Sequence, residues 1–250
     1  MKELLSPVEG GCQPTGVASL TPSIFFKFNL QFESPEIQIN GIAPASQSYL
    51  PRPVPYSRMT AEKDAVITVA GLMALSARTS PKGKGIDTIH IQILTGKELK
   101  RLSKHLADLG ETRNIGFFKR DAANIAASDV VVLIGTTGQK VAGVNCGACG
   151  FLSCAVMTAE FRNRDEVTTD FAGPNCAIRM TDLGIAIGSA VKTAQIHNVD
   201  NRIMFSAGVA AIDLGYLEKK CTVVYAIPLS ASCKNIFFDL ESGKNLQNKT

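Results

Sequence analysis

The chain has 250 residues, of which 45% are hydrophobic, and a formal net charge of +4 at pH 7. This length and apolar content allow one substantial core and one or two domains. The mild charge and the absence of Trp argue against a basic, base-stacking surface, so we expect no nucleic-acid partner. No window approaches the roughly eighteen apolar residues of a transmembrane helix, so we expect no membrane span.

Cysteine usage and the first residues of the chain indicate a compartment. Seven cysteines in a chain of this length are more typical of a reducing interior than of a disulfide framework. The segment 1–7 contains an acidic residue and a proline where a signal peptide needs an uninterrupted apolar stretch. We therefore expect a cytoplasmic protein.

Residues 1–57 differ in character from the rest of the chain. Eight of the eleven prolines lie here and leave little room for a helix. We interpret residues 1–57 as an extended or disordered tail, or as an upstream extension of the reading frame with Met59 as the natural start. Residues 58–245 form the expected folded domain.

The first elements of that domain follow from apolar periodicity. Thr60 is suited to cap a helix over residues 60–80, since Pro81 disfavours a helical residue before it. The alternation of apolar and polar residues over 89–93 predicts a strand. A helix is expected over 96–109, with Gly110 as its terminator.

The later elements alternate between helices and buried strands. Residues 130–134 are a continuous apolar run, which is typical of a strand buried on both faces. Pro228 is expected to close the last strand. We predict a mixed α/β (α+β) fold, a sheet flanked by helices, with helices over 119–127, 154–162, 177–196 and 201–214 and strands over 130–134 and 222–227.

Four cysteines are the main chemical feature of the sequence. Cys146, Cys149 and Cys154 lie close together, and Cys176 follows about twenty residues later. Three thiols on one tight loop and a fourth from another segment are the ligand set of a four-iron, four-sulfur cluster. Gly147 and Gly150 would let the backbone adopt unusual dihedrals and bring amide groups close to the sulfurs. We predict that residues 139–178 form a small iron-sulfur cap.

Three alternatives remain for these cysteines. A structural zinc site usually repeats pairs of ligands two residues apart, which Cys154 and Cys176 do not follow. A redox pair of the thioredoxin type would use Cys146 and Cys149 and leave the other two unexplained. The cysteines would otherwise be plain buried side chains.

The cysteine motif resembles the four-iron domain of the large subunit of corrinoid iron-sulfur proteins and of electron-transport complex subunits. The chain from about Met59 to Asp239 is similar to a family of uncharacterised proteins that contain a ferredoxin domain. The segments that carry this resemblance are 77–85, 145–150, 182–194, 198–202 and 227–232.

The order of helices and strands is also similar to that of the nitroreductase fold. In that family the loop after the first helix and the segment after the last strand bind flavin mononucleotide (FMN), and the enzymes are intertwined dimers. The resemblance therefore implies FMN as a second cofactor and a homodimer. A solvated basic turn is the alternative for Lys82 and Lys84. The matching phosphate or flavin contacts are Arg78, Ser80, Lys82 and Lys84 in the first loop, and Ser230, Ser232 and Lys234 in the last.

The longest predicted helix, 177–196, carries small residues at three- and four-residue spacing: Gly184, Ala186, Gly188 and Ala190. They would allow close packing either in the core or at a subunit interface, and we weigh the two equally. His90, His105 and His197 have no paired ligand spacing, so we expect structural or solvated roles for them.

Together these patterns predict a 4Fe-4S redox protein that transfers electrons to or from a flavin, an unknown substrate or a redox partner protein. The alternative is a non-catalytic protein with a structural or sensing metal site, iron-sulfur or zinc. A structural cluster would be required for folding, whereas a redox cluster on a self-sufficient core would be removable.

Overall fold

The computed structural model of the chain describes residues 58–163 and 169–238. The predicted tail, residues 1–57, lies outside this range, as do the end of the predicted domain and residues 164–168 of the predicted cap. Every described residue belongs to one unit, Pro53–Thr250.

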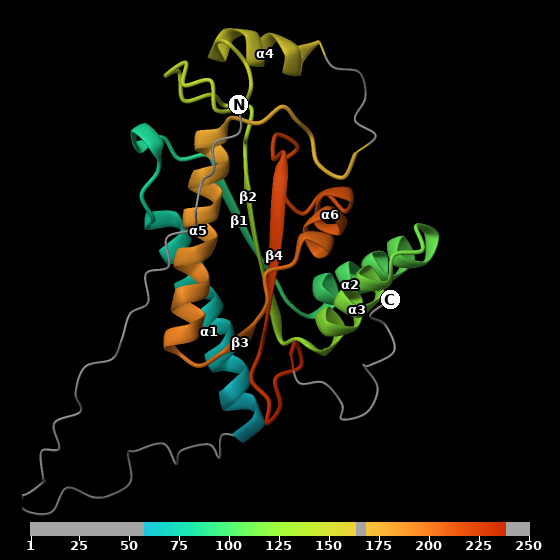
Figure 1. Cartoon of the computed structure of the whole chain (residues 1–250). Helices are drawn as coiled ribbons and strands as arrows, with labels where there is room; N and C mark the ends of the chain where they lie inside the picture. Colours follow the sequence, from blue (N-terminus) through green and yellow to red (C-terminus); the bar gives the residue numbers. More distant parts are fainter. Residues whose placement is uncertain (1–57, 164–168, 239–250) are drawn as a thin grey trace, which may run out of the picture. The chain divides into compact units, whose positions relative to one another are not determined.

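A four-stranded antiparallel sheet is the centre of this unit (Figure 1). Its strands are β1 (Ile89–Leu94), β2 (Val130–Thr136), β3 (Asp200–Asn201) and β4 (Val223–Ser230), arranged in the order β1-β2-β4-β3. Every residue of β2 is buried, as its unbroken apolar run predicts for a strand covered on both faces. The predicted mixed α/β fold, a sheet flanked by helices, is confirmed, and the structure shows that the sheet is antiparallel.

Helices cover both faces of the sheet (Figure 1). On one face lie α1 (Arg58–Thr79) and α5 (Ala177–Ile196). On the other lie α2 (Gly96–Thr112), α3 (Gly116–Ala127) and α6 (Phe205–Asp213). Alternate residues of β2 enter the two resulting cores, because side chains of a strand point to opposite faces in turn. The short helix α4 (Cys154–Arg162) lies beyond one end of the sheet.

The prediction that Gly110 terminates the second helix is wrong. Helix α2 continues to Thr112, and Gly110 is a buried residue within it. A β-carbon at Gly110 would lie 2.9 Å from the Lys119 side chain and 3.1 Å from the β-carbon of Phe118. The glycine is therefore needed for the close approach of α3 rather than for ending the helix.

Two boundaries near the end of the chain were also predicted wrongly. Pro228 lies inside β4 and does not close it. The amide of Ala226 donates to the carbonyl of Met204, on the edge of β4 that faces away from β2. The nitrogen of residue 228, two residues on, faces that same edge. β3 ends at Asn201, which pairs with Leu229, so no residue of β3 lies opposite Pro228. The missing N–H of this proline therefore removes no hydrogen bond between β3 and β4. Pairing of Asp200 and Asn201 with β4 also delays the start of the next helix to Phe205.

The small residues of α5 divide between the core and the surface. Ala186 and Ala190 are fully buried in the core shared with α1. Gly184 and Gly188 are exposed, and a β-carbon at either would meet no atom within 4 Å. Core packing therefore explains Ala186 and Ala190, whereas it does not explain Gly184 and Gly188. None of the described helices is both long and apolar enough to cross a bilayer.

Candidate functional site

The cysteine loop follows β2 at one end of the sheet. Gly147 and Gly150 have φ angles of 71° and 85°, which confirms the unusual dihedrals predicted for them. The amide of Gly150 donates to the carbonyl of Gly147 at 2.9 Å, so this part of the loop is a tight turn between Cys146 and Cys154. Left-handed backbone at these two positions turns the chain sharply beside the cysteines.

Hydrogen bonds close the loop at its far end. The side-chain oxygen of Asn145 accepts from the amide of Cys154 at 2.9 Å, and the Ser153 hydroxyl caps α4. Backbone hydrogen bonds, above all from Asn145 and then from Gly143 and Val144, hold the pKa of the Cys154 thiol below its ordinary value. The thiolate is the form of cysteine that ligates a metal.

The fourth cysteine is anchored to the same end of the sheet. The amide of Cys176 donates to the carbonyl of Gly138 at 2.8 Å. Asn175, the preceding residue, accepts a hydrogen bond from the hydroxyl of Thr222 at 2.7 Å. A β-carbon at Gly138 would lie 2.0 Å from the Asn175 side-chain oxygen, so the segment approaches a glycine that no other residue could replace without displacement.

A small apolar cluster then joins the loop to this segment. Cys176 is buried beside Ala142 and Met157, and Cys149 and Phe151 pack against the same cluster. The structure thus brings two of the four predicted ligands into one cluster.

The four thiols have unequal exposure. Cys146 is exposed, Cys149 and Cys154 are half-buried, and Cys176 is buried. Within residues 58–163 and 169–238, no three His, Cys, Asp or Glu side chains are gathered closely enough to hold a metal ion. The chemistry of these residues nevertheless fits an iron-sulfur cluster. The four thiols are the ligands that such a cluster needs, and the amide groups near Cys154 and the left-handed glycines allow hydrogen bonds to its sulfurs.

A buried arginine supports the base of the loop. Arg179, one turn after Cys176 on α5, is fully buried and donates from Nε to the carbonyl of Lys140 at 2.8 Å. Its Nη1 donates to Asp182 at 2.8 Å and to the carbonyl of Gly83 at 3.1 Å. The start of α5 therefore holds both the entry to the cysteine loop and the turn after α1.

The first predicted flavin loop has largely structural contacts. The ammonium of Lys82 donates to the carbonyls of Arg78 and Ser80, both at 2.7 Å, and so satisfies groups at the end of α1. The hydroxyl of Ser80 is buried and donates to Ala77. Lys84 is exposed with a φ of 59°, in agreement with the basic-turn alternative.

The second predicted flavin segment lies at the other end of the sheet. Ser230 is the last residue of β4, and the exposed Ser232 and Lys234 follow it. The first loop instead precedes Ile89, which pairs with Thr136 opposite the start of β4. β4 has eight residues, so its two ends lie roughly 23 Å apart at the usual rise per residue. The structure does not bring the two sets together within one chain.

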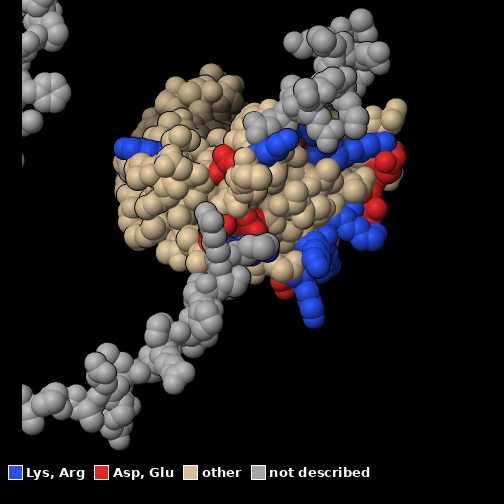
Figure 2. Space-filling view, turned by 90° about the horizontal axis from the view of Figure 1, so that it is seen from below, with Lys and Arg blue, Asp and Glu red and all other residues tan. Residues whose placement is uncertain are grey.

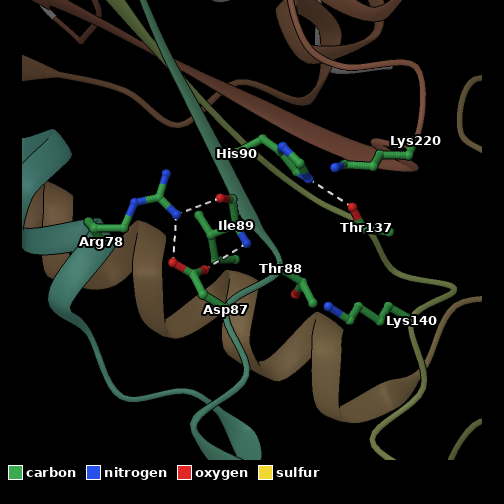
Figure 3. A pocket seen from close by; sticks show the side chains of 8 residues that line it. All are labelled: Arg78, Asp87, Thr88, Ile89, His90, Thr137, Lys140 and Lys220. Carbon is green, nitrogen blue, oxygen red and sulfur yellow. Dashed lines mark hydrogen bonds and ion pairs between the residues drawn. The ribbon is translucent and has the colours of Figure 1, made fainter.

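Of the expected phosphate or flavin contacts, Arg78 lines a pocket beside the cysteine loop whose other residues the sequence patterns missed (Figure 3). Its cavity measures about 330 Å³. Figure 3 shows Arg78 on one side and the ammonium groups of Lys140 and Lys220 pointing in from the other, with His90 and Thr137 between them. No local pattern links these residues, because the register of β1 with β2 brings them together.

Hydrogen bonds order the wall of this pocket. The guanidinium of Arg78 donates to Asp87 at 2.6 Å and to the carbonyl of Ile89 at 2.7 Å. Partial burial acts to raise the pKa of Asp87, but hydrogen bonds from Arg78 and the Ile89 amide outweigh it and hold the pKa below its ordinary value. The ring of His90 contacts the Thr137 hydroxyl at 2.7 Å and Glu218 at 3.2 Å. His90 is thus fixed at the pocket rather than simply solvated.

Comparison with known proteins identifies the family. Residues 172–240 match a family described as "uncharacterized protein containing a ferredoxin domain". An uncharacterised protein of Archaeoglobus fulgidus is 43% identical over 178 residues, which are 71% of this chain and 93% of that protein. The chain belongs to this ferredoxin-domain family. The family match includes Cys176 and begins after the other three predicted ligands.

Solved nitroreductases share the general arrangement of helices and sheet, as the sequence resemblance led us to expect. The nitroreductase CinD from Lactococcus lactis, in complex with nicotinic acid, is 12% identical with a TM-score of 0.45, over 67% of this chain and 78% of that one. NfrA2 of B. megaterium is 14% identical with a TM-score of 0.44, over 71% of this chain and 61% of that one. Similarity at these sequence identities and TM-scores supports no conclusion about cofactor or substrate.

Proposed function

We propose that this ferredoxin-domain protein binds a four-iron, four-sulfur cluster and transfers single electrons. Cys146, Cys149, Cys154 and Cys176 would be its ligands. The observation that carries the proposal is the attachment of Cys176 to the loop that holds the other three. The amide of Cys176 donates a hydrogen bond to the carbonyl of Gly138, and its side chain packs in the same apolar cluster as Cys149. A bound cluster would supply one-electron chemistry at this end of the sheet.

The residues around the loop would set the properties of such a site. Amide groups near Cys154 favour its thiolate, and amide hydrogen bonds to sulfur raise the reduction potential of a cluster. The exposed Cys146 leaves one side open to solvent, where a redox partner protein would approach. The buried Cys176 lies on the side that faces the domain.

The position of the loop favours a redox role over a structural one. The two large cores pack around the sheet and contain none of the four cysteines. The cysteine loop has a separate small cluster beyond the end of the sheet. We expect a domain with two separate cores to fold without its metal, so chelation should remove the cluster and leave far-ultraviolet circular dichroism largely unchanged. Loss of the folded signal on chelation would instead support the structural alternative.

Metal analysis of anaerobically purified protein tests the proposal. About four irons and four acid-labile sulfides per chain are expected, with visible absorbance that dithionite bleaches. Cys154→Ser should abolish this absorbance or leave a three-iron form. Cys233→Ser is the matched control, because Cys233 is exposed and lies outside the loop. One zinc per chain and no colour would refute the redox function, and an unchanged iron content in Cys154→Ser would refute the ligand assignment.

We also propose that the protein is a homodimer through the outer face of α1 and α5. Ile67 and Leu75 on α1 and Ile185 on α5 are 44%, 58% and 39% exposed, and Gly184 and Gly188 on α5 are exposed with open space above them. Figure 2 shows charged side chains gathered on the side of α2 and α3 and mostly uncharged residues on the side of α1 and α5. Apolar and small residues allow close packing of a second copy.

A dimer would also determine which residues could bind FMN. The two sets of expected flavin contacts lie at opposite ends of β4, so one FMN would need residues of two chains. Fluorescence of flavin released from the purified protein tests whether FMN is bound. A protein that carries FMN while remaining a monomer would contradict this arrangement.

A further inference from the structure

We propose that the pocket between Arg78, Lys140 and Lys220 binds the phosphate group of a small molecule. The lining contains three cationic side chains and one carboxylate, that of Asp87 (Figure 3). The cavity of about 330 Å³ is of the size that holds a small ligand. The proposal concerns binding alone and does not depend on the cluster.

Three different segments supply the cations, and two of them are held in place. Arg78 is at the end of α1, where Asp87 and the carbonyl of Ile89 accept from its Nη1. Its Nε and Nη2 have no partner among the described residues and remain as donors. Lys220 lies just before β4 and is paired with Glu218 at 2.7 Å. Guanidinium and ammonium groups from separate segments define a fixed place for an anion.

Lys140 is the cation whose charge is least compensated. Its backbone is fixed, because its amide donates to Thr137 at 3.1 Å and its carbonyl accepts from the buried Arg179. Its ammonium makes no hydrogen bond or ion pair with any residue in the described part of the chain. A positive charge held over a pocket in this way attracts anions strongly and in a salt-dependent manner.

A phosphate group fits this arrangement better than a carboxylate. A phosphate monoester offers three terminal oxygens, one for each of the three cations, whereas a carboxylate offers two. The hydroxyl of Thr137 and the ring of His90, which contact each other at 2.7 Å, provide further polar groups between the arginine and the lysines. The remaining volume would hold the organic part of the ligand.

Calorimetric titration of the full chain with inorganic phosphate, glycerol phosphate and succinate tests the proposal. Both phosphates should bind, more weakly as salt concentration rises, and succinate should bind at least about tenfold more weakly. Lys140→Gln and Lys220→Gln should each weaken phosphate binding by about tenfold, the typical effect of losing one charge-assisted contact. Lys219→Gln is the matched control, since Lys219 is exposed and does not line the pocket.

Several results would overturn the proposal. Absence of phosphate binding by the wild-type chain is one, and preference for succinate is another. An equal loss of binding in Lys219→Gln would show that net charge, not the pocket, attracts the anion. Unchanged binding in both Lys140→Gln and Lys220→Gln would place the anion elsewhere. Circular dichroism and iron content equal to wild type should accompany each variant, so that a folding defect or loss of the cluster is recognised separately.

Discussion

Arg179 and Asp182 form a buried ion pair on α5, with 2.8 Å between Nη1 and Oδ2 and side chains that are 0% and 3% exposed. The other carboxylate oxygen accepts from the amide of Gly83 at 2.7 Å. The guanidinium also donates to the carbonyl of Lys140. This pair therefore ties the turn after α1 and the entry to the cysteine loop to the same helix.

Replacing Asp182 should be strongly destabilising. Asp182→Ala would leave the charge of Arg179 buried without its partner, and we expect the free energy of unfolding to fall by about 3–5 kcal/mol. Urea denaturation measures this, and hydrogen exchange at the Gly83 amide should become faster. Asp108→Ala is the control, because its pair with Lys104 is 60% and 79% exposed and should contribute less than about 0.5 kcal/mol. Equal effects of the two variants would contradict the role of the buried pair.

Adding one methyl group at Gly138 should disturb the anchoring of Cys176. In Gly138→Ala the new β-carbon would lie 2.0 Å from the Asn175 oxygen and 2.7 Å from that of Thr222. We expect a loss of about 1–3 kcal/mol in stability, together with lower iron content in the purified protein. Gly116→Ala should lower neither, because a β-carbon there meets no atom within 4 Å and alanine favours the helix. Full iron content in Gly138→Ala would show that the Cys176 segment does not depend on this contact.

The thiol of Cys221 should be unreactive and should make stability fall at high pH. Burial raises its pKa from an ordinary 9.0 to about 12, and the charge of Glu218 adds to this. The folded thiol thus keeps its proton where the unfolded thiol has lost it. Its stabilising contribution is complete below pH 9 and decreases as pH rises towards 12.

Alkylation at a pH near 9, measured by mass spectrometry, tests whether the Cys221 thiol is unreactive. Cys233, which is exposed, should react with iodoacetamide much faster than the buried Cys221. In Cys221→Ser the decrease of stability at high pH should become shallower. Similar alkylation rates at the two cysteines would refute the burial of Cys221.

A charge on the face formed by α1 and α5 should dissociate the proposed dimer. Ile185→Glu would place a carboxylate in an apolar contact, so sedimentation should shift from dimer to monomer. Phe117→Glu is the control, because Phe117 is 45% exposed on α3, on the opposite face of the sheet. A monomeric wild-type protein, or a dimer that survives Ile185→Glu and dissociates in Phe117→Glu, would contradict the proposed interface.

Local pattern in the sequence was sufficient for most of the helices and strands and for the candidate ligands. The apolar run after Asp129 predicted the central strand, because a strand covered on both faces needs apolar side chains in both directions. The spacing of Cys146, Cys149 and Cys154, with glycines between them, predicted a tight loop with unusual dihedrals, because a residue without a β-carbon adopts them at no steric cost.

Tertiary structure alone decided where distant residues meet. The register of Ile89 with Thr136 places Arg78 and His90 opposite Lys140 and Lys220, and it separates Ser80 from Ser230 by the length of a strand. Periodicity tells which face of a strand is buried, but pairing between strands depends on packing and turns far along the chain. The same packing kept α2 helical through Gly110, where the approach of α3 outweighs the weak helix propensity of glycine.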